Sequence, residues 1–205
     1  MILEFVVNQI LEKNRLKNGV KVYQYLLNNR DIKTISENEE FKNKYSGFYG
    51  LNRVLSNYDK GEYFKIMELY KYEKISFEKG KDDKAKSIFF QICDITGRCE
   101  ISFASKMLHH LDSSFPIWDS VVATKHFKFN RINTGDLNVR KEIMWNLYLK
   151  YICNFYRYMK SPDGVKIIKL FDDKIGADIS DVKKIDFVLW QDKTIAIKIP
   201  DEFCN

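Results

Sequence analysis

Apolar residues recur every three or four positions along most of the chain, the spacing that places them on one face of an α-helix. The pattern predicts a mostly α fold with short connections. Residues 193–199 alternate between apolar and polar side chains, which predicts one short C-terminal strand. Helices are expected over residues 1–14, 17–29, 62–72, 85–95, 102–111, 139–159 and 179–190, with a short solvated helix within 30–44, where Ser36 and Glu39 have capping-box spacing.

A charged run at residues 78–84 contains Gly80 and predicts a surface loop. The run also marks an expected boundary between two helical lobes, roughly residues 1–80 and 81–205. A chain of 205 residues is long enough to bury one shared core. We therefore expect a single two-lobed domain over residues 1–205.

The most informative pattern lies in residues 102–119. Ser102 can cap a helix whose apolar side chains repeat every four residues. The polar residues 112–114 end that helix, and Pro116 keeps the following chain extended. Asp119 comes next, directly before another helical pattern. It is therefore either a helix N-cap or a catalytic acid held rigidly at a helix N-terminus, at the wall of a pocket.

Residues 45–53 gather aromatic side chains around two glycines. One interpretation is an aromatic core beside a tight turn. The other is a loop that binds a ligand or stacks on a base, with Asn52 or Arg53 as a polar contact. The sequence leaves both open.

No metal site is expected. His109 and His110 are adjacent on a predicted helix and cannot both face one way, and no third ligand is near. His126 follows Lys125 near a helix end and is expected at the surface. The cysteines lack the C-x-x-C spacing of zinc or iron–sulfur sites, so reduced thiols are expected at Cys93, Cys99, Cys153 and Cys204.

The net charge of +6 is a modest indication of a polyanionic partner. No run of eighteen apolar residues is present, so we expect no membrane span. The N-terminus lacks the basic start and cleavage site of a signal peptide. A cytoplasmic protein is the simplest expectation.

At residues 102–120 the chain resembles the helix-hairpin-helix DNA glycosylases. Ser102-Phe103-Ala104, followed by Phe115-Pro116-Ile117-Trp118-Asp119, is similar to the Ser-Thr-Ala and Phe-Pro-Ile-Leu-Asp of the adenine glycosylases. Closer still, Phe103-Ala104-Ser105-Lys106 and Pro116-Ile117-Trp118-Asp119-Ser120 resemble bacterial proteins with an 8-oxoguanine DNA glycosylase fold. Residues 45–53 and 179–190 are also similar to segments of that group.

The resemblance implies a two-lobed helical glycosylase with a helix-hairpin-helix element. Its partner would be double-stranded DNA bearing 8-oxoguanine or another modified base, in genome repair or in defence against foreign DNA. A monomer without cofactors is expected. The resemblance implies Asp119 as the catalytic carboxylate. The expected base pocket is formed by Tyr49, Asn52, Arg53, Ser102 and Trp118, and the expected DNA-backbone contacts are Arg98, Lys125, Lys183 and Lys184.

The sequence departs from the family at two points. The usual hairpin turn has Gly-x-Gly, whereas only Gly97 is present here, with Arg98 and Glu100 at the glycine positions. Bifunctional relatives carry a lysine where this chain has Ser102, and Lys106 lies one helical turn further along. Lys106 is thus a solvated surface charge, a phosphate contact or, if buried, a nucleophile with a lowered pKa. The bacterial resemblance includes this lysine and so implies a catalytic Lys106.

Two other functions remain open. The chain could be a DNA-binding module that keeps the fold without the chemistry. It could also be a helical protein-interaction domain in which Asp119 is only a cap. Salt-dependent DNA binding separates the last from the others, and formation of abasic sites separates the enzyme from both.

Overall fold

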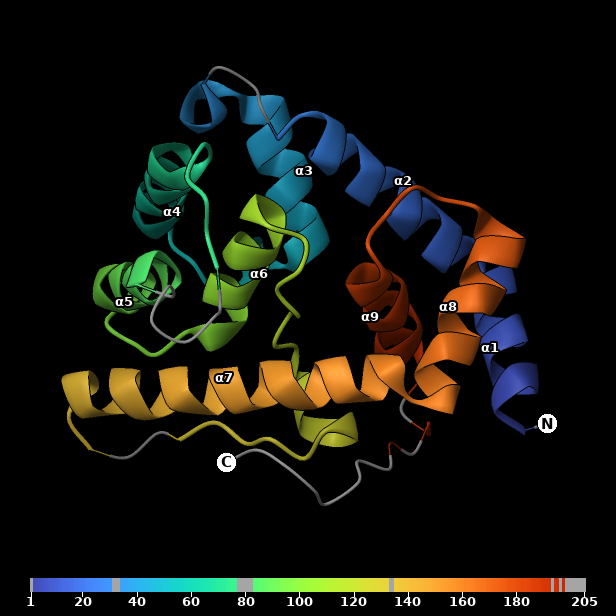
Figure 1. Ribbon diagram of the computed structural model, residues 1–205. Coiled ribbons are helices and arrows are strands. Elements are labelled where there is room, and N and C mark those ends of the chain that lie inside the picture. The colour runs from blue at the N-terminus through green and yellow to red at the C-terminus, as the bar shows by residue number, and fades with distance from the viewer. Residues whose placement is uncertain are drawn as a thin grey trace.

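Helices connected by short segments form most of the chain in the computed structural model, which describes residues 2–30, 34–76, 83–132, 135–192, 194, 195 and 197 (Figure 1). The α-helices are α1 (Ile2–Glu12), α2 (Asn14–Asn28), α3 (Glu39–Tyr49), α4 (Asn57–Tyr70), α5 (Asp83–Thr96), α6 (Ile101–Leu111), α7 (Leu137–Lys160), α8 (Pro162–Ile175) and α9 (Asp181–Gln191). Short 3₁₀ turns are η1 (Ile35–Glu37) and η2 (Leu51–Arg53), and η3 (Ser120–His126) is π-helical. The predicted mostly α fold is confirmed.

Local caps explain where the N-terminal helices begin and end. Asn38, not the expected Ser36, caps α3 by accepting a 2.9 Å hydrogen bond from the Phe41 N–H. The helix then runs through the expected aromatic turn and stops at Gly50, whose φ of 72° lies in the left-handed region that favours glycine. Helix α4 begins earlier than predicted because Ser56 caps it.

The two ends of the chain pack together. Figure 1 shows α1 and α2 beside α8 and α9, with α4 and α5 on the opposite side of α6. This grouping differs from the expected division at residue 80, because the first two helices lie with the last two. The predicted strand at 193–199 and the predicted loop at 78–84 fall mostly outside the described residues.

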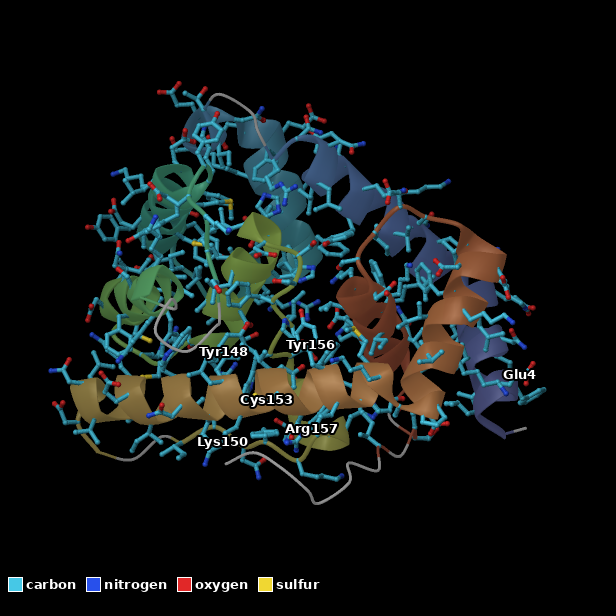
Figure 2. All side chains as sticks on the ribbon, in the orientation of Figure 1. Glu4, Tyr148, Lys150, Cys153, Tyr156 and Arg157 are labelled. Atoms are coloured by element: carbon cyan, nitrogen blue, oxygen red, sulfur yellow. The ribbon has the colours of Figure 1, made fainter. Side chains whose placement is uncertain are left out.

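Helix α7 runs along one edge of the molecule and supports its centre (Figure 1). Its inner face is largely aromatic, and rings at Trp145, Tyr148, Tyr151 and Phe155 are buried. In Figure 2 Tyr148 and Tyr156 lie on the side of α7 that faces α6, and Lys150 lies on the opposite side. The inner side carries the hydroxyl groups that position the segment before Asp119.

That segment, residues 112–119, is called the strap. Five consecutive strap carbonyls, from Ser113 to Ile117, are each hydrogen-bonded by a side chain from another part of the fold. Hydrogen bonds from side chains to these carbonyls fix an extended segment that has no sheet partner. The donors and distances are Ser180 Oγ to Ser113 (3.1 Å), Tyr156 Oη to Ser114 (2.8 Å), His109 Nδ1 to Phe115 (2.7 Å), Tyr148 Oη to Pro116 (2.8 Å) and Tyr151 Oη to Ile117 (2.8 Å).

Candidate functional site

A cavity of about 670 Å³ lies between α2, α3, α6, α9 and the end of the strap. Its size is typical of small-molecule and cofactor sites. Its interior is built from buried side chains that include Tyr49, Lys106, Lys183, Asp186 and Phe187. Exposed residues on the same wall form its mouth: Arg15, Gly47, Arg53, Val54, Ser120, Arg131 and Trp190.

Lys106 extends from α6 into this cavity. The residue is only 8% exposed, and its ammonium donates a 2.9 Å hydrogen bond to the Tyr49 carbonyl oxygen. Burial lowers the pKa of Lys106 to about 8, against the opposing effect of the Asp119 and Asp186 carboxylates; the positive charges of Lys183 and Arg131 lower it further. About one tenth of this amine is therefore neutral at about pH 7, far more than for an ordinary lysine.

Asp119 lies at the end of the strap, half-buried in the cavity wall. Its Oδ1 accepts a 2.7 Å hydrogen bond from the Val121 N–H and so caps η3. Among the described residues its Oδ2 has no hydrogen-bond partner. The N-cap interpretation is confirmed, and the cap leaves one carboxylate oxygen available to a ligand.

A buried ion pair forms another part of the interior. Lys183 and Asp186 are one turn apart on α9 and meet at 2.7 Å, and both are buried. The Lys183 ammonium lies near the rings of Tyr23, Phe48, Tyr49 and Phe187, at 4.7–5.5 Å from their centroids. Burial raises the pKa of Asp186, and the Lys183 charge opposes that effect. A desolvated pair of this kind is rarely a source of stability, which favours a role in ligand binding.

Three backbone N–H groups of the hairpin between α5 and α6 are hydrogen-bonded inside the turn. Gly97, with φ of 62°, ends α5, and its N–H donates to the Asp94 carbonyl. The Arg98 N–H donates to the Cys93 carbonyl (3.2 Å), and the Glu100 N–H donates to the Arg98 carbonyl (2.9 Å). These three backbone donors are therefore satisfied within the turn. A glycine-rich hairpin that binds phosphate needs such donors to be free.

Several predicted site residues meet in the cavity wall: Asp119, Lys106, Tyr49, Arg53 and Ser102. Ser102 does not cap α6 as expected, because the helix begins at Ile101 after Glu100. Ser102 instead lies in the first turn of α6, on the side of the cavity. The aromatic cluster at 45–53 is thus partly core, through the buried Tyr45, and partly cavity wall, through Tyr49.

Two expected pocket residues lie elsewhere. Trp118 is completely buried against Phe129 and Tyr151 and is not part of the cavity wall. Asn52 is exposed and accepts a 3.2 Å hydrogen bond from the Lys60 ammonium, also outside the wall. The apolar packing of the strap explains the first difference. The position of Asn52 in η2, after the turn at Gly50, explains the second.

Of the residues expected to contact the DNA backbone, two are exposed and two are buried. Lys125 is exposed, and Arg98 is exposed and paired with Glu100. Lys183 and Lys184 do not lie on an exposed basic face, because both are buried in ion pairs. The Lys184 ammonium lies 2.8 Å from both Asp172 and Asp181, whereas Lys183 faces the cavity.

His126 is also placed differently from expectation. Its imidazole is buried, and its ring nitrogens lie 2.8 Å from the Ile195 carbonyl oxygen and 2.9 Å from the Leu189 carbonyl oxygen. His126 therefore fastens η3, which begins at Asp119, to the end of α9.

Sequence reasoning did not single out Arg15, Asp186 and Phe187, which are among the residues that line the cavity. For Asp186 a signal was present, since an acidic residue three positions after Lys183 shares its helix face and can form an ion pair. Arg15 and Gly19 come from α2, which is distant in sequence from α6, and no local pattern links them to it.

The described residues contain no cluster of three or more His, Cys, Asp or Glu side chains placed to hold a metal ion. None of the described helices has the length and apolar composition needed to span a bilayer. Comparison of the chain with protein-family models, with curated proteins and with solved structures found no match.

Proposed function

We propose that the protein is a DNA glycosylase of the helix-hairpin-helix type, which excises an oxidised or otherwise modified base from double-stranded DNA. It would act as a monomer on cytoplasmic, nucleoid-associated DNA. The observation that carries the proposal is the Lys106 amine, buried with a pKa of about 8 in a cavity whose wall also contains Asp119. An amine and a carboxylate in one partly desolvated cavity are the groups that a lyase-type glycosylase requires.

The chemical step uses the neutral form of Lys106. The amine attacks C1′ of the deoxyribose, and the new N–C bond forms as the glycosidic bond breaks. The electron pair of that bond leaves with the base, which takes up a proton. The nitrogen then loses a proton, the C1′–O4′ bond opens, and O4′ is protonated to leave a Schiff base. Loss of a C2′ proton with cleavage of the C3′–O bond would cut the strand.

Asp119 would stabilise the positive charge that develops on the sugar. At about 4 Å and an effective dielectric constant of about 20, a carboxylate and a unit positive charge attract by on the order of 4 kcal/mol. This corresponds to roughly a thousandfold in rate. The strap holds the carboxylate in place before substrate arrives, so little reorganisation is needed during the reaction.

The cavity interior suits a base that has left the DNA stack. Phe48, Tyr49 and Phe187 provide aromatic surface, and Asp186 provides a carboxylate that accepts N–H donors. Such a pocket can exclude water from the sugar while it holds the base. The base that it holds would be 8-oxoguanine in repair or a modified base in foreign DNA.

The alternative function is a DNA-binding module that keeps the same fold but lacks the chemistry. The unsatisfied Asp119 oxygen and the lowered pKa of Lys106 favour the enzyme, because a simple binding module needs neither.

A panel of duplexes tests the proposed function. Each duplex carries one modified base, 8-oxoguanine among them, and is incubated with the protein and then treated with alkali to cut abasic sites. We expect cleavage at the modified base of at least one duplex, none with Lys106→Gln, and only slow residual cleavage with Asp119→Asn. Binding of duplex DNA without any abasic sites across the panel would instead support the non-catalytic module.

A further inference from the structure

The DNA phosphates need a binding surface other than the hairpin. The hairpin donors at Gly97, Arg98 and Glu100 are satisfied inside the turn, and the Arg98 side chain is paired with Glu100 at 3.3 Å. Arg131 is paired with the same carboxylate, also at 3.3 Å. The N–H groups of Gly97, Arg98 and Glu100 and these two guanidinium groups would therefore each lose an internal contact on binding a polyanion.

Two other arginines at the cavity mouth are differently placed. Arg15 lies in the first turn of α2 and Arg53 at the end of η2, and both are exposed. Neither has an ion-pair partner in the part of the chain that the structure describes. Arg15 instead stacks over the Trp190 ring at 4.6 Å, which fixes its guanidinium plane at the mouth. Arginine binds phosphate oxygens with two parallel hydrogen bonds, so each of these side chains suits one phosphate.

The wall of the cavity next to Arg53 has an uncovered backbone. Gly47 lies within α3, and a Cβ atom added to it would meet nothing within 4 Å. A glycine inside a helix costs about 1 kcal/mol relative to alanine. Gly19 differs, because a Cβ there would lie only 3.2 Å from the Phe187 ring. The protein's own packing thus explains Gly19 but leaves the open space over Gly47 unexplained.

We propose that Arg15 and Arg53 bind two phosphates of the strand that carries the target base, and that the bare backbone at Gly47 gives this strand room against α3. The inference rests on the proposed function, because it takes double-stranded DNA as the partner. In this chain the two arginines take the place of the hairpin as the principal phosphate contact. The target strand then enters the cavity from the side of α2 and α3, where Lys106 and Asp119 line the interior.

The test measures duplex affinity by fluorescence anisotropy over a series of salt concentrations. Each lost phosphate contact lowers the slope of log affinity against log salt by about 0.9. Arg15→Gln and Arg53→Gln should each lower the slope by this amount and weaken binding roughly fivefold to tenfold at about 0.1 M salt. Lys150→Gln removes an exposed charge on the outer side of α7 and is the matched control, with an unchanged slope expected (Figure 2).

A pair of glycine variants tests the role of the open wall. Gly47→Leu should weaken duplex binding without changing the salt slope, because it fills space and removes no charge. Gly61→Leu is its control: Gly61 lies within α4, also has nothing within 4 Å of an added Cβ, and is outside the cavity wall. We expect Gly61→Leu to bind DNA like the parent protein.

The outcomes separate this inference from the proposed function. Salt slopes that match the parent protein in both arginine variants, or a loss confined to Arg98→Gln, would overturn the phosphate assignment even if base excision is intact. Lower slopes in both variants, in a protein that excises no base, would support the assignment and reject the glycosylase. Equal effects of Gly47→Leu and Gly61→Leu would reject the role of the open wall.

Discussion

The Ser105 hydroxyl oxygen accepts a 2.9 Å hydrogen bond from the Trp118 backbone N–H. Ser105 precedes Lys106 on α6, and Trp118 precedes Asp119 at the end of the strap. The same hydroxyl donates back to the Ser102 carbonyl at 3.1 Å. This buried hydrogen bond, with the one from His109 of α6 to the Phe115 carbonyl, couples the two elements that carry the proposed nucleophile and the proposed carboxylate, and it is the one nearest to both groups in the sequence.

Replacing Ser105 tests this coupling. Ser105→Ala leaves the buried Trp118 N–H without its acceptor, and we expect a loss of about 1–3 kcal/mol in the free energy of unfolding. Single-turnover base excision should also slow, because Asp119 is no longer fixed relative to Lys106. Tyr156→Phe is the comparison, since it removes a strap bond at Ser114, farther from Asp119. Equal slowing in both variants would show that general strap stability, not this coupling, matters.

The pH dependence of the reaction follows from Lys106. Burial is the largest cause of its lowered pKa of about 8, and only the deprotonated amine can attack the sugar. The rate of covalent-intermediate formation should therefore rise with pH to a midpoint near about 8 and then level off. Residual activity of Asp119→Asn should have a lower midpoint, because the Asp119 charge raises the pKa of Lys106. A rate independent of pH between about 6 and 9 would exclude this amine as the nucleophile.

Asp119→Asn separates the two roles of this side chain. Asparagine is as good an N-cap as aspartate, so the free energy of unfolding should change little. Base excision should fall by roughly a thousandfold, because the sugar cation loses its counter-charge. Duplex affinity should stay the same or increase, since one negative charge near DNA is removed. If the variant excises bases as fast as the parent protein, Asp119 is only a cap.

A feature of the fold or of the site can be predicted from the sequence when residues close together in the chain determine it. The periodic apolar residues predicted most helices, and the position of Asp119 before a helical pattern predicted its cap. The helix ends were less predictable: Ser36 looked like a cap, but Asn38 is the one that meets the Phe41 N–H. Competing polar residues two positions apart offer the same local chemistry, and tertiary packing decides between them.

The cavity itself depends on contacts between distant parts of the chain. Lys183 and Lys184 form a basic pair in the sequence, which suggests an exposed face. The Asp172 partner of Lys184 becomes evident only after α8 and α9 pack together, whereas Asp186 lies one turn from Lys183 on the same helix. Trp118 likewise looked like a pocket residue from its place beside Asp119, but rings from α7 and the segment after η3 enclose it.

Two buried histidines on α6 predict acid sensitivity. Burial lowers the pKa of His110 to about 3 and that of His109 well below its usual value. Burial keeps His109 neutral in the fold, where its Nδ1 donates to the Phe115 carbonyl and its Nε2 lies 2.7 Å from the Tyr23 hydroxyl. Since both take up a proton on unfolding below about pH 6.5, the free energy of unfolding should fall as the pH drops below that value.

His110→Leu removes one of these two histidines and so measures how much its protonation contributes to the pH dependence of stability. Denaturation of the parent and variant should be compared between about pH 6 and pH 5, where each histidine contributes up to about 1.4 kcal/mol per pH unit. As the pH falls, the free energy of unfolding of the variant should decrease less steeply than that of the parent protein, by up to about 1.4 kcal/mol per pH unit. His110 has no hydrogen-bond partner among the described residues, so no bond is broken. Parallel pH profiles would mean that His110 is not neutral in the folded protein.

The central claim is that Lys106 forms a Schiff base with the sugar of a modified nucleotide. Borohydride reduces such an intermediate in place and links the protein covalently to the DNA strand. Wild-type protein should give this cross-link during turnover on a duplex that it cleaves, Ser102→Ala should retain it, and Lys106→Gln should lose it while still binding the duplex. Active wild-type protein that forms abasic sites without any cross-link would contradict the account and leave Asp119 to act with water alone.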